Sequence, residues 1–144
     1  MIKKMMTAAG ALMLLSSAAM AASPNMAQGL WKITTSMEIP GMPYPMKPMS
    51  VTTCIHKKDL QDAGKTLPQA QRQNKDCKMK DRKVTGDHVS FKIVCTGKHP
   101  ATSTADMTYH GTSYEGTMTT VFDQNGAKRT MTYHYKGERI GDCK

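Results

Sequence analysis

The chain has 144 residues, of which 39% are hydrophobic and 22% charged, and its formal net charge is +9. This length suits one domain that buries about two thirds of its unfolded surface. The basic excess points toward anionic partners.

Residues 1–21 have the three parts of a secretory signal. Lys3 and Lys4 are basic, MMTAAGALMLLSSAA is apolar but short for a bilayer span, and Ala19-Met20-Ala21 fits the small-residue cleavage rule. We expect cleavage to leave a single domain over residues 22–144, periplasmic or secreted, with no membrane-spanning segment. A retained anchor is the alternative.

Cleavage would remove two of the 20 basic residues and none of the 11 acidic ones, which leaves a charge of +7. Because an exported protein rarely meets nucleic acid, we expect an anionic envelope component as the charged partner. Lipid head groups, lipopolysaccharide and acidic polymers belong to this class. General solubility is the alternative explanation of the charge.

The first predicted strand begins at Gly29 and alternates with period two. One face carries Trp31, Ile33, Met37 and Ile39, and the other carries Lys32, Thr34, Ser36 and Glu38. A loop rich in proline and methionine follows, then a second strand that ends near Cys54. Residues 56–64 predict a short helix stopped by Gly64, and 65–76 predict an exposed connection.

Four cysteines in an exported chain predict two disulfides, with three possible connectivities. The turn signal Thr85-Gly86-Asp87 separates two strand-like segments. A hairpin centred on Gly86 would place Cys77 opposite Cys95, which leaves Cys54 to pair with Cys143. No C-x-x-C is present, so a zinc or redox site is not favoured.

The same register pairs Met79 with Ile93 and Lys83 with Val89 on one face. The other face would carry Lys78, Lys80 and Arg82, with Lys80 opposite Lys92. We interpret this basic stripe as an anion-binding surface or as a solvated face that protects a sheet edge.

Two further hairpins have clear turn chemistry. Gly111-Thr112 predicts a two-residue turn that pairs Tyr109 with Tyr114, and Asn125-Gly126 predicts a type I′ turn. Their registers agree on one apolar face, which collects Met107, Tyr109, Tyr114, Met118, Phe122, Met131, Tyr133 and Tyr135. Gly116 would lie between Met107 and Tyr135, and Glu115 opposite Lys136.

These strands predict an all-β fold: an antiparallel meander of about seven or eight strands forming a small barrel or a curled half-barrel. A Cys54–Cys143 bond would bring the C-terminal end beside the second strand. A two-sheet sandwich is the alternative.

Several segments carry a resemblance. They are Gly29-Leu30-Trp31 with the following ITTSMEIPGMPYPM, Val51-Thr52-Thr53-Cys54, Cys77, Cys95, residues 113–118 (SYEGTM) and residues 137–143 (GERIGDC). The chain resembles the bacterial family called domain of unknown function 3617. This implies a small exported protein whose activity is not established. Gly29-Leu30-Trp31 also resembles the start of lipocalin-type barrels.

Catalysis is not expected. The five histidines are scattered, and neither G-x-S-x-G nor H-E-x-x-H is present. Asp106, Thr117 and His134 would line up on the outer face, but two strand spacings, about 10 Å, would separate the first from the last. We expect no cofactor.

Three binding hypotheses remain. The leading one is a non-enzymatic site for a small hydrophobic or lipid-like ligand on the apolar face, at Trp31, Met37, Tyr109, Tyr114, Met118, Tyr133 and Tyr135; a filled core is its alternative. The second is Cu(I) binding by Met42, Met46 and Met49, with an apolar lid as the alternative. The third is docking of the methionine-rich loop or the basic stripe on an anionic envelope component.

Overall fold

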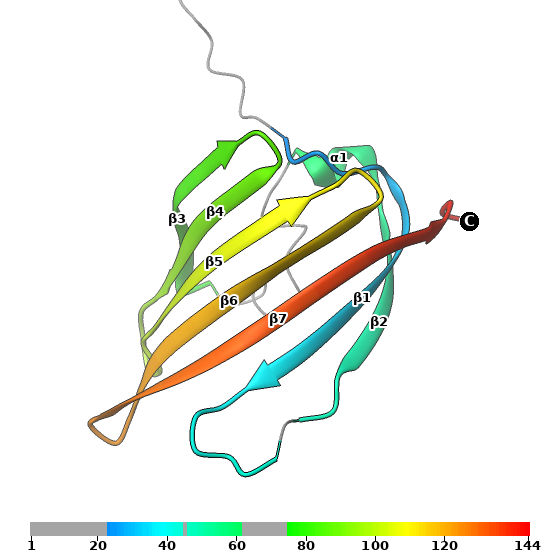
Figure 1. Ribbon diagram of the computed structural model, residues 1–144. Helices are drawn as coiled ribbons and strands as arrows, with labels where there is room; N and C mark the ends of the chain where they lie inside the picture. The colour runs from blue at the N-terminus through cyan, green and yellow to red at the C-terminus, as the bar shows by residue number, and fades with distance from the viewer. Residues whose placement is uncertain (1–22, 45, 62–74) are drawn as a thin grey trace, which may run out of the picture.

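The computed structural model describes residues 23–44, 46–61 and 75–144. The predicted signal segment, its cleavage site and nearly all of the predicted connection at 65–76 lie outside this part. The described residues form seven strands and one short helix, which confirms the all-β prediction (Figure 1). The elements are β1 (Gly29–Glu38), β2 (Met49–Ile55), α1 (Lys57–Leu60), β3 (Cys77–Thr85), β4 (His88–Cys95), β5 (Ala101–Tyr109), β6 (Ser113–Gln124) and β7 (Ala127–Gly141).

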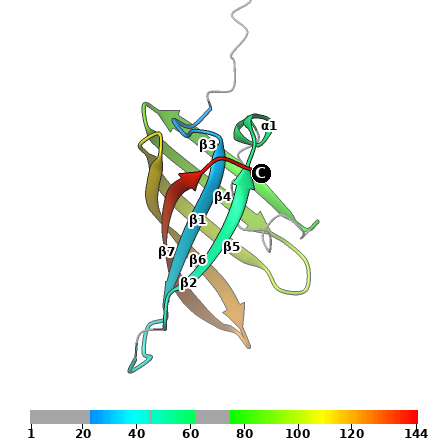
Figure 2. The same ribbon diagram turned by 90° about the vertical axis from the view of Figure 1, so that its right-hand side faces the viewer.

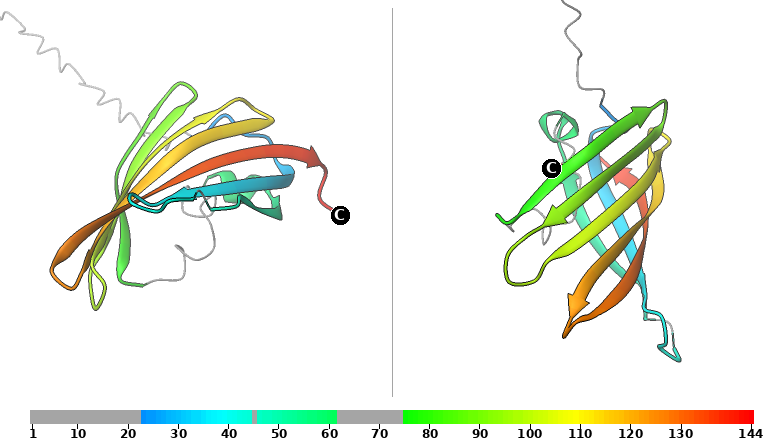
Figure 3. Two further views of the ribbon diagram at one scale, coloured as in Figure 1. Left: turned by 60° about the horizontal axis from the view of Figure 1, so that its bottom comes forward. Right: turned by 90° about the vertical axis from the view of Figure 1, so that its left-hand side faces the viewer.

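All seven strands belong to one antiparallel sheet in the order β2-β1-β7-β6-β5-β4-β3. The sheet curls into an open trough, and β2 and β3 are its two edges (Figure 3). The curled half-barrel is therefore the correct form of the prediction. The ladder does not close into a barrel, and the single sheet rules out the sandwich alternative for these strands.

The two hairpins with clear turn chemistry have the predicted registers. Tyr109 pairs with Tyr114 across the first, and the second turns at Asn125-Gly126, whose φ angles of 55° and 80° fit a type I′ turn. Glu115 lies opposite Lys136, as predicted. Gly116 lies between Met107 and Tyr135, where a Cβ would overlap the Asp106 carbonyl and the Met107 sulfur.

The core fills the concave face of the sheet. Trp31 is fully buried, and its ring packs 5.7 Å from that of Tyr114, which in turn lies 5.4 Å from Tyr109. Buried hydrophobic residues from the segment before β1 and from β2, β4, β5, β6 and β7 complete it: Met26, Ile55, Val89, Phe91, Ile93, Ala105, Met107, Met118 and Tyr135. Alternation of apolar and polar side chains along each strand thus produces one continuous apolar face.

A bulge in β3 changes the register of the β3–β4 hairpin. Thr85 pairs with His88, so the turn has two residues, and Val84 rather than Lys83 lies opposite Val89. The bulge lies between Lys80 and Lys83, where Asp81 adopts a φ of 53°. It shifts the register by one residue, so that Cys77 still lies opposite Cys95 and the two form a disulfide. The predicted bond is confirmed, although the turn alone would misplace it.

The bulge also corrects the predicted basic stripe. Lys78 and Lys80 point outward, and Lys80 lies opposite Lys92 as predicted. Arg82 was expected beside them, but the extra residue turns it toward the concave side, where it is half-buried. The Asp81 carboxylate lies 3.2 Å from Lys92 Nζ and offsets part of the remaining charge.

The first and last strands pair directly, which sequence analysis did not predict. β7 pairs with β1 from Glu38 to Leu30, so β1 separates β2 from the C-terminal strand (Figure 2). The body of β7 therefore lies beside β1, and only the residues after it reach β2. Cys143, just beyond β7, still reaches Cys54 and forms the predicted second disulfide.

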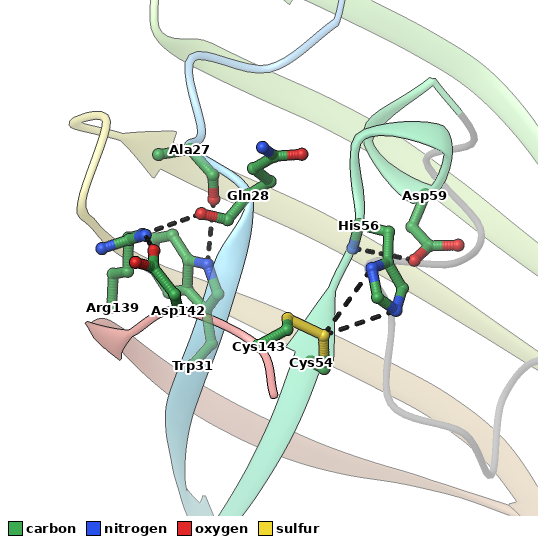
Figure 4. The surroundings of a disulfide bond; sticks show 9 residues. All are labelled: Ala27, Gln28, Trp31, Cys54, His56, Asp59, Arg139, Asp142 and Cys143. Atoms are coloured by element: carbon green, nitrogen blue, oxygen red, sulfur yellow. Dashed lines mark hydrogen bonds and ion pairs between the residues drawn. A yellow bond between two sulfur atoms is a disulfide. The ribbon is translucent and has the colours of Figure 1, made fainter.

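Side chains around this disulfide tie the strand ends together (Figure 4). Trp31 Nε1 donates to the Ala27 carbonyl at 3.0 Å, and Arg139 Nε donates to the Gln28 carbonyl at 2.7 Å. Arg139 also forms an ion pair with Asp142. A Cβ at Gly29 would meet the Arg139 side chain, so the close approach of these two strands needs glycine there.

The short helix predicted after β2 is present as α1, a single turn. The His56 backbone N–H donates to Asp59 Oδ2 at 3.0 Å, which satisfies one of the free donors at the start of the helix. Gly64, its predicted end, lies outside the described residues. Within the described part of the chain, no helix is long and apolar enough to cross a membrane.

We predict that Asp81→Val lowers the free energy of unfolding by about 1–2 kcal/mol, because a β-branched residue is strained at positive φ. Asp81→Gly removes the same carboxylate but tolerates this φ, so it should cost clearly less. Lys83→Val, in the same strand outside the bulge, is the control for the change of side chain. Urea unfolding of the oxidised proteins measures all three, and equal losses for the valine and glycine variants at position 81 would contradict the role of the bulge.

Candidate functional site

The loop between β1 and β2, residues 39–48, is here called the Met/Pro loop. It begins with a β-turn in which the Met42 N–H donates to the Ile39 carbonyl at 3.2 Å. Pro40 and Gly41 occupy the central positions, and Gly41 has a φ of 87°. Proline followed by a glycine at positive φ is the sequence that a type II turn requires. The local sequence therefore directs the chain back on itself at the end of the sheet.

Exposed hydrophobic side chains gather at this end of the molecule. Among the described residues, seven large hydrophobics are exposed, and five of them lie between positions 42 and 51: Met42, Tyr44, Met46, Met49 and Val51. The Met49 and Val51 side chains share the concave face with Ile33, which lies opposite Val51. Such a concentration of apolar surface marks an interaction site more often than scattered single residues do.

Two grooves flank the start of the Met/Pro loop. The first, the loop groove, has a volume of about 460 Å³ and is lined by residues of the loop and by strand residues that include Met37, Glu38 and His134. Met42 and Met46 are among its loop residues. The outward-facing His134 lies directly opposite Ser36, so β7 supplies one wall and the loop supplies the other.

The second groove, the hairpin groove, has a volume of about 410 Å³ and lies between Ile39-Pro40 and the β6–β7 hairpin. Phe122 and Met131 give it an apolar lining, while Lys128 and Arg129 supply two cations. Both grooves fall within the range of roughly 300–1,000 Å³ usual for small-molecule sites. The pairing of apolar and cationic side chains suits a ligand that has an apolar body and an anionic head.

The seven residues predicted to bind a hydrophobic ligand all lie on the concave side, but most of them are packed core. Trp31, Tyr109, Tyr114, Met118 and Tyr135 are buried and leave little surface for a ligand. Met37 and Tyr133 pair directly across β1 and β7 and are half-buried. On this face, the exposed large hydrophobic side chains lie at its open end, at Met49 and Val51 beside the Met/Pro loop.

The three methionines predicted to bind metal do not all meet. Met42 and Met46 line the loop groove, whereas Met49 begins β2 opposite Thr35 and is 69% exposed. His134 lines the same groove, and sequence analysis did not connect it with the methionines. Its position follows from the β1–β7 pairing, which no local pattern reveals.

A second cluster of metal-binding residue types surrounds the disulfide at the other end of the sheet. Among the His, Cys, Asp and Glu side chains of the described residues, the one group of three that could share an ion is Cys54, His56 and Cys143. His56 Nε2 lies 3.4 Å from Cys54 Sγ. Because the two sulfurs are bonded to each other, this cluster offers only the imidazole while the protein is oxidised.

The predicted row of Asp106, Thr117 and His134 is present on the convex face, each residue opposite the next. The two ends have other partners: Asp106 Oδ1 lies 3.2 Å from His88 Nε2, and His134 Nε2 lies 3.3 Å from Glu38 Oε2. All four cysteines are in disulfides, so none supplies a free thiol nucleophile.

Fold and site together define a small all-β domain, crosslinked by two disulfides, with apolar grooves at one end of an open curled sheet. The chain belongs to the family described as Protein of unknown function (DUF3617), whose model matches residues 26–143. No curated protein and no solved structure gives a match. The resemblance seen in the sequence is thereby confirmed, and two disulfides are compatible with a compartment outside the reducing cytoplasm.

The buried tyrosines make stability sensitive to alkali. Burial, and to a lesser degree Tyr133, raises the pKa of Tyr135 from 10.0 to about 12, and burial also raises the pKa of Tyr114. The unfolded chain therefore loses these protons at lower pH than the folded chain. The contribution of the tyrosines to the free energy of unfolding is intact below about pH 10 and falls as pH rises through about 12.

We predict that the free energy of unfolding of Tyr135→Phe depends less steeply on pH across this window. Urea midpoints at successive pH values measure it, and identical slopes would contradict the prediction.

Proposed function

We propose that this is an exported, non-enzymatic protein that binds a small hydrophobic or lipid-like ligand at the Met/Pro-loop end of its sheet. The observation that carries the proposal is the hairpin groove, whose apolar wall lies beside the cations Lys128 and Arg129. The core is complete without this wall, since it is formed by buried residues elsewhere on the concave face. A partly exposed apolar wall next to two cations is therefore better explained by an occupant than by folding.

The hairpin groove supports a ligand with an anionic head group. Its wall of Ile39, Phe122 and Met131 accepts an apolar body, and the side chains of Lys128 and Arg129 flank it. An arginine guanidinium can hold a carboxylate or phosphate with two parallel hydrogen bonds. Apolar surface and positive charge, the two features noted in the sequence, thus lie side by side in the hairpin groove. A long-chain fatty acid is the simplest compound with this chemistry.

Binding of a fluorescent long-chain fatty acid tests the proposal. Met131→Asp places a charge in the hairpin groove and should weaken binding about tenfold or more, because burial of such a side chain contributes about 1.5–3 kcal/mol. Val121→Asp is the matched control, since Val121 belongs to the same hairpin but points to the convex face and is already exposed. Its affinity should be unchanged.

The head-group contribution has its own comparison. Arg129→Gln should weaken binding of the fatty acid but leave binding of the corresponding fatty alcohol unchanged, and only the acid should lose affinity as salt rises. Absence of saturable binding, or an equal loss in the position 121 and position 131 variants, would overturn the proposal. Native mass spectrometry of protein purified from its own host then identifies the natural ligand.

A further inference from the structure

We propose a second, separate site: a Cu(I) site in the loop groove, formed by the imidazole of His134 and the thioethers of Met42 and Met46. All three residues line this one groove, although His134 comes from β7 and the methionines from the Met/Pro loop. Thioether sulfur is a soft ligand that selects Cu(I), and imidazole also suits copper. The inference does not depend on the fatty-acid site, which uses the other groove.

The Met/Pro loop holds both thioethers outside the core. The turn at residues 39–42 brings Met42 back toward the end of β1, and Met42 and Met46 are 50% and 42% exposed. A methionine that only fills space would be expected among the buried core residues, as Met107 and Met118 are. The sulfurs of the loop are therefore accessible to an incoming ion.

The ring of His134 has a carboxylate partner. Its Nε2 lies 3.3 Å from Glu38 Oε2, and Nε2 donates in the tautomer that carries the proton on this atom. In that tautomer the lone pair lies on Nδ1, which is the atom that we assign to the metal. Histidines that bind a metal in proteins almost always donate their other ring N–H to a carboxylate, a backbone carbonyl or a water, and this contact orients the ring. Glu38 also balances the single positive charge of Cu(I).

His88 provides an internal comparison. It makes the equivalent contact with a carboxylate, 3.2 Å from Asp106, and is also on the convex face. Its neighbours across the adjacent strands are Thr85 and Thr108. An imidazole–carboxylate pair alone therefore recurs on this sheet, and the two methionines are what distinguish the His134 pair.

The structure also replaces one of the ligands suggested by the sequence. Met49 shares the concave face with Ile33 and Val51, whereas Ser36 and His134 face the convex side. Met49 is thus the natural negative control for Met42 and Met46. The Cys54, His56 and Cys143 cluster is a rival only after its disulfide is reduced.

Competition titration of the oxidised protein with Cu(I), kept reduced by ascorbate and reported by a chromogenic Cu(I) chelator, tests the site. We expect one Cu(I) per chain. His134→Gln, Met42→Leu and Met46→Leu should each weaken binding about tenfold or more, while His88→Gln and Met49→Leu leave it unchanged. Glu38→Ala, which removes the positioning carboxylate, should weaken binding roughly 10–100-fold.

Methyl signals of the methionines give an independent readout. On addition of Cu(I), NMR shifts should be confined to Met42 and Met46, with Met49 unaffected. Binding that survives His134→Gln, or that is lost equally in the His88 and Met49 controls, would overturn the site. Binding that appears only after disulfide reduction would assign the ion to Cys54, His56 and Cys143 instead. The copper experiment and the fatty-acid experiment change different residues in different grooves, so either proposal can fail while the other holds.

Discussion

The structure depends on the connection between the two ends of the chain. β1 pairs with β7 along nearly its whole length, and the Cys54–Cys143 bond joins positions 89 residues apart. In the chain-entropy model a crosslink of this span contributes between about 4 and 5 kcal/mol, a large share of the roughly 5–15 kcal/mol usual for a domain. Both grooves use this connection, because each has walls from the Met/Pro loop after β1 and from β7.

The charged residues of the β3 edge and those of the β6–β7 hairpin have different surroundings. β3 is an edge strand, and its outward lysines and its bulge at Asp81 both discourage pairing with another chain. The same bulge reconciles a two-residue turn with the Cys77–Cys95 disulfide. Of the two interpretations of these lysines, edge protection fits their place on an edge strand, and anion binding by them stays a prediction. The cations placed beside an apolar surface are those of the β6–β7 hairpin, Lys128 and Arg129.

Much of the fold was predictable because it rests on local rules. Asn125-Gly126 and Gly111-Thr112 set two registers, and alternation along each strand then placed every aromatic residue of β5, β6 and β7 on the correct face. Two features could not be read in this way. The bulge depends on Asp81 adopting a positive φ, which its sequence permits but does not require. The β1–β7 pairing joins strands about a hundred residues apart, and it alone brings His134 to the Met/Pro loop.

Burial separates the residues that specify the fold from those left for binding. Predicted apolar-face residues such as Trp31, Tyr114 and Met118 are buried in the core of the sheet, where they stabilise the fold and are not exposed to a ligand. Met42 and Met46 of the Met/Pro loop lie outside the strands and outside the core, and the turn at Pro40-Gly41 sets the direction in which the loop leaves β1. Further prolines at positions 43 and 48 limit the conformations that the loop must lose on binding. Apolar side chains exposed to water in a connecting loop do not stabilise the fold. A conformationally restricted loop loses less entropy when it binds a small ligand, and this favours tight binding.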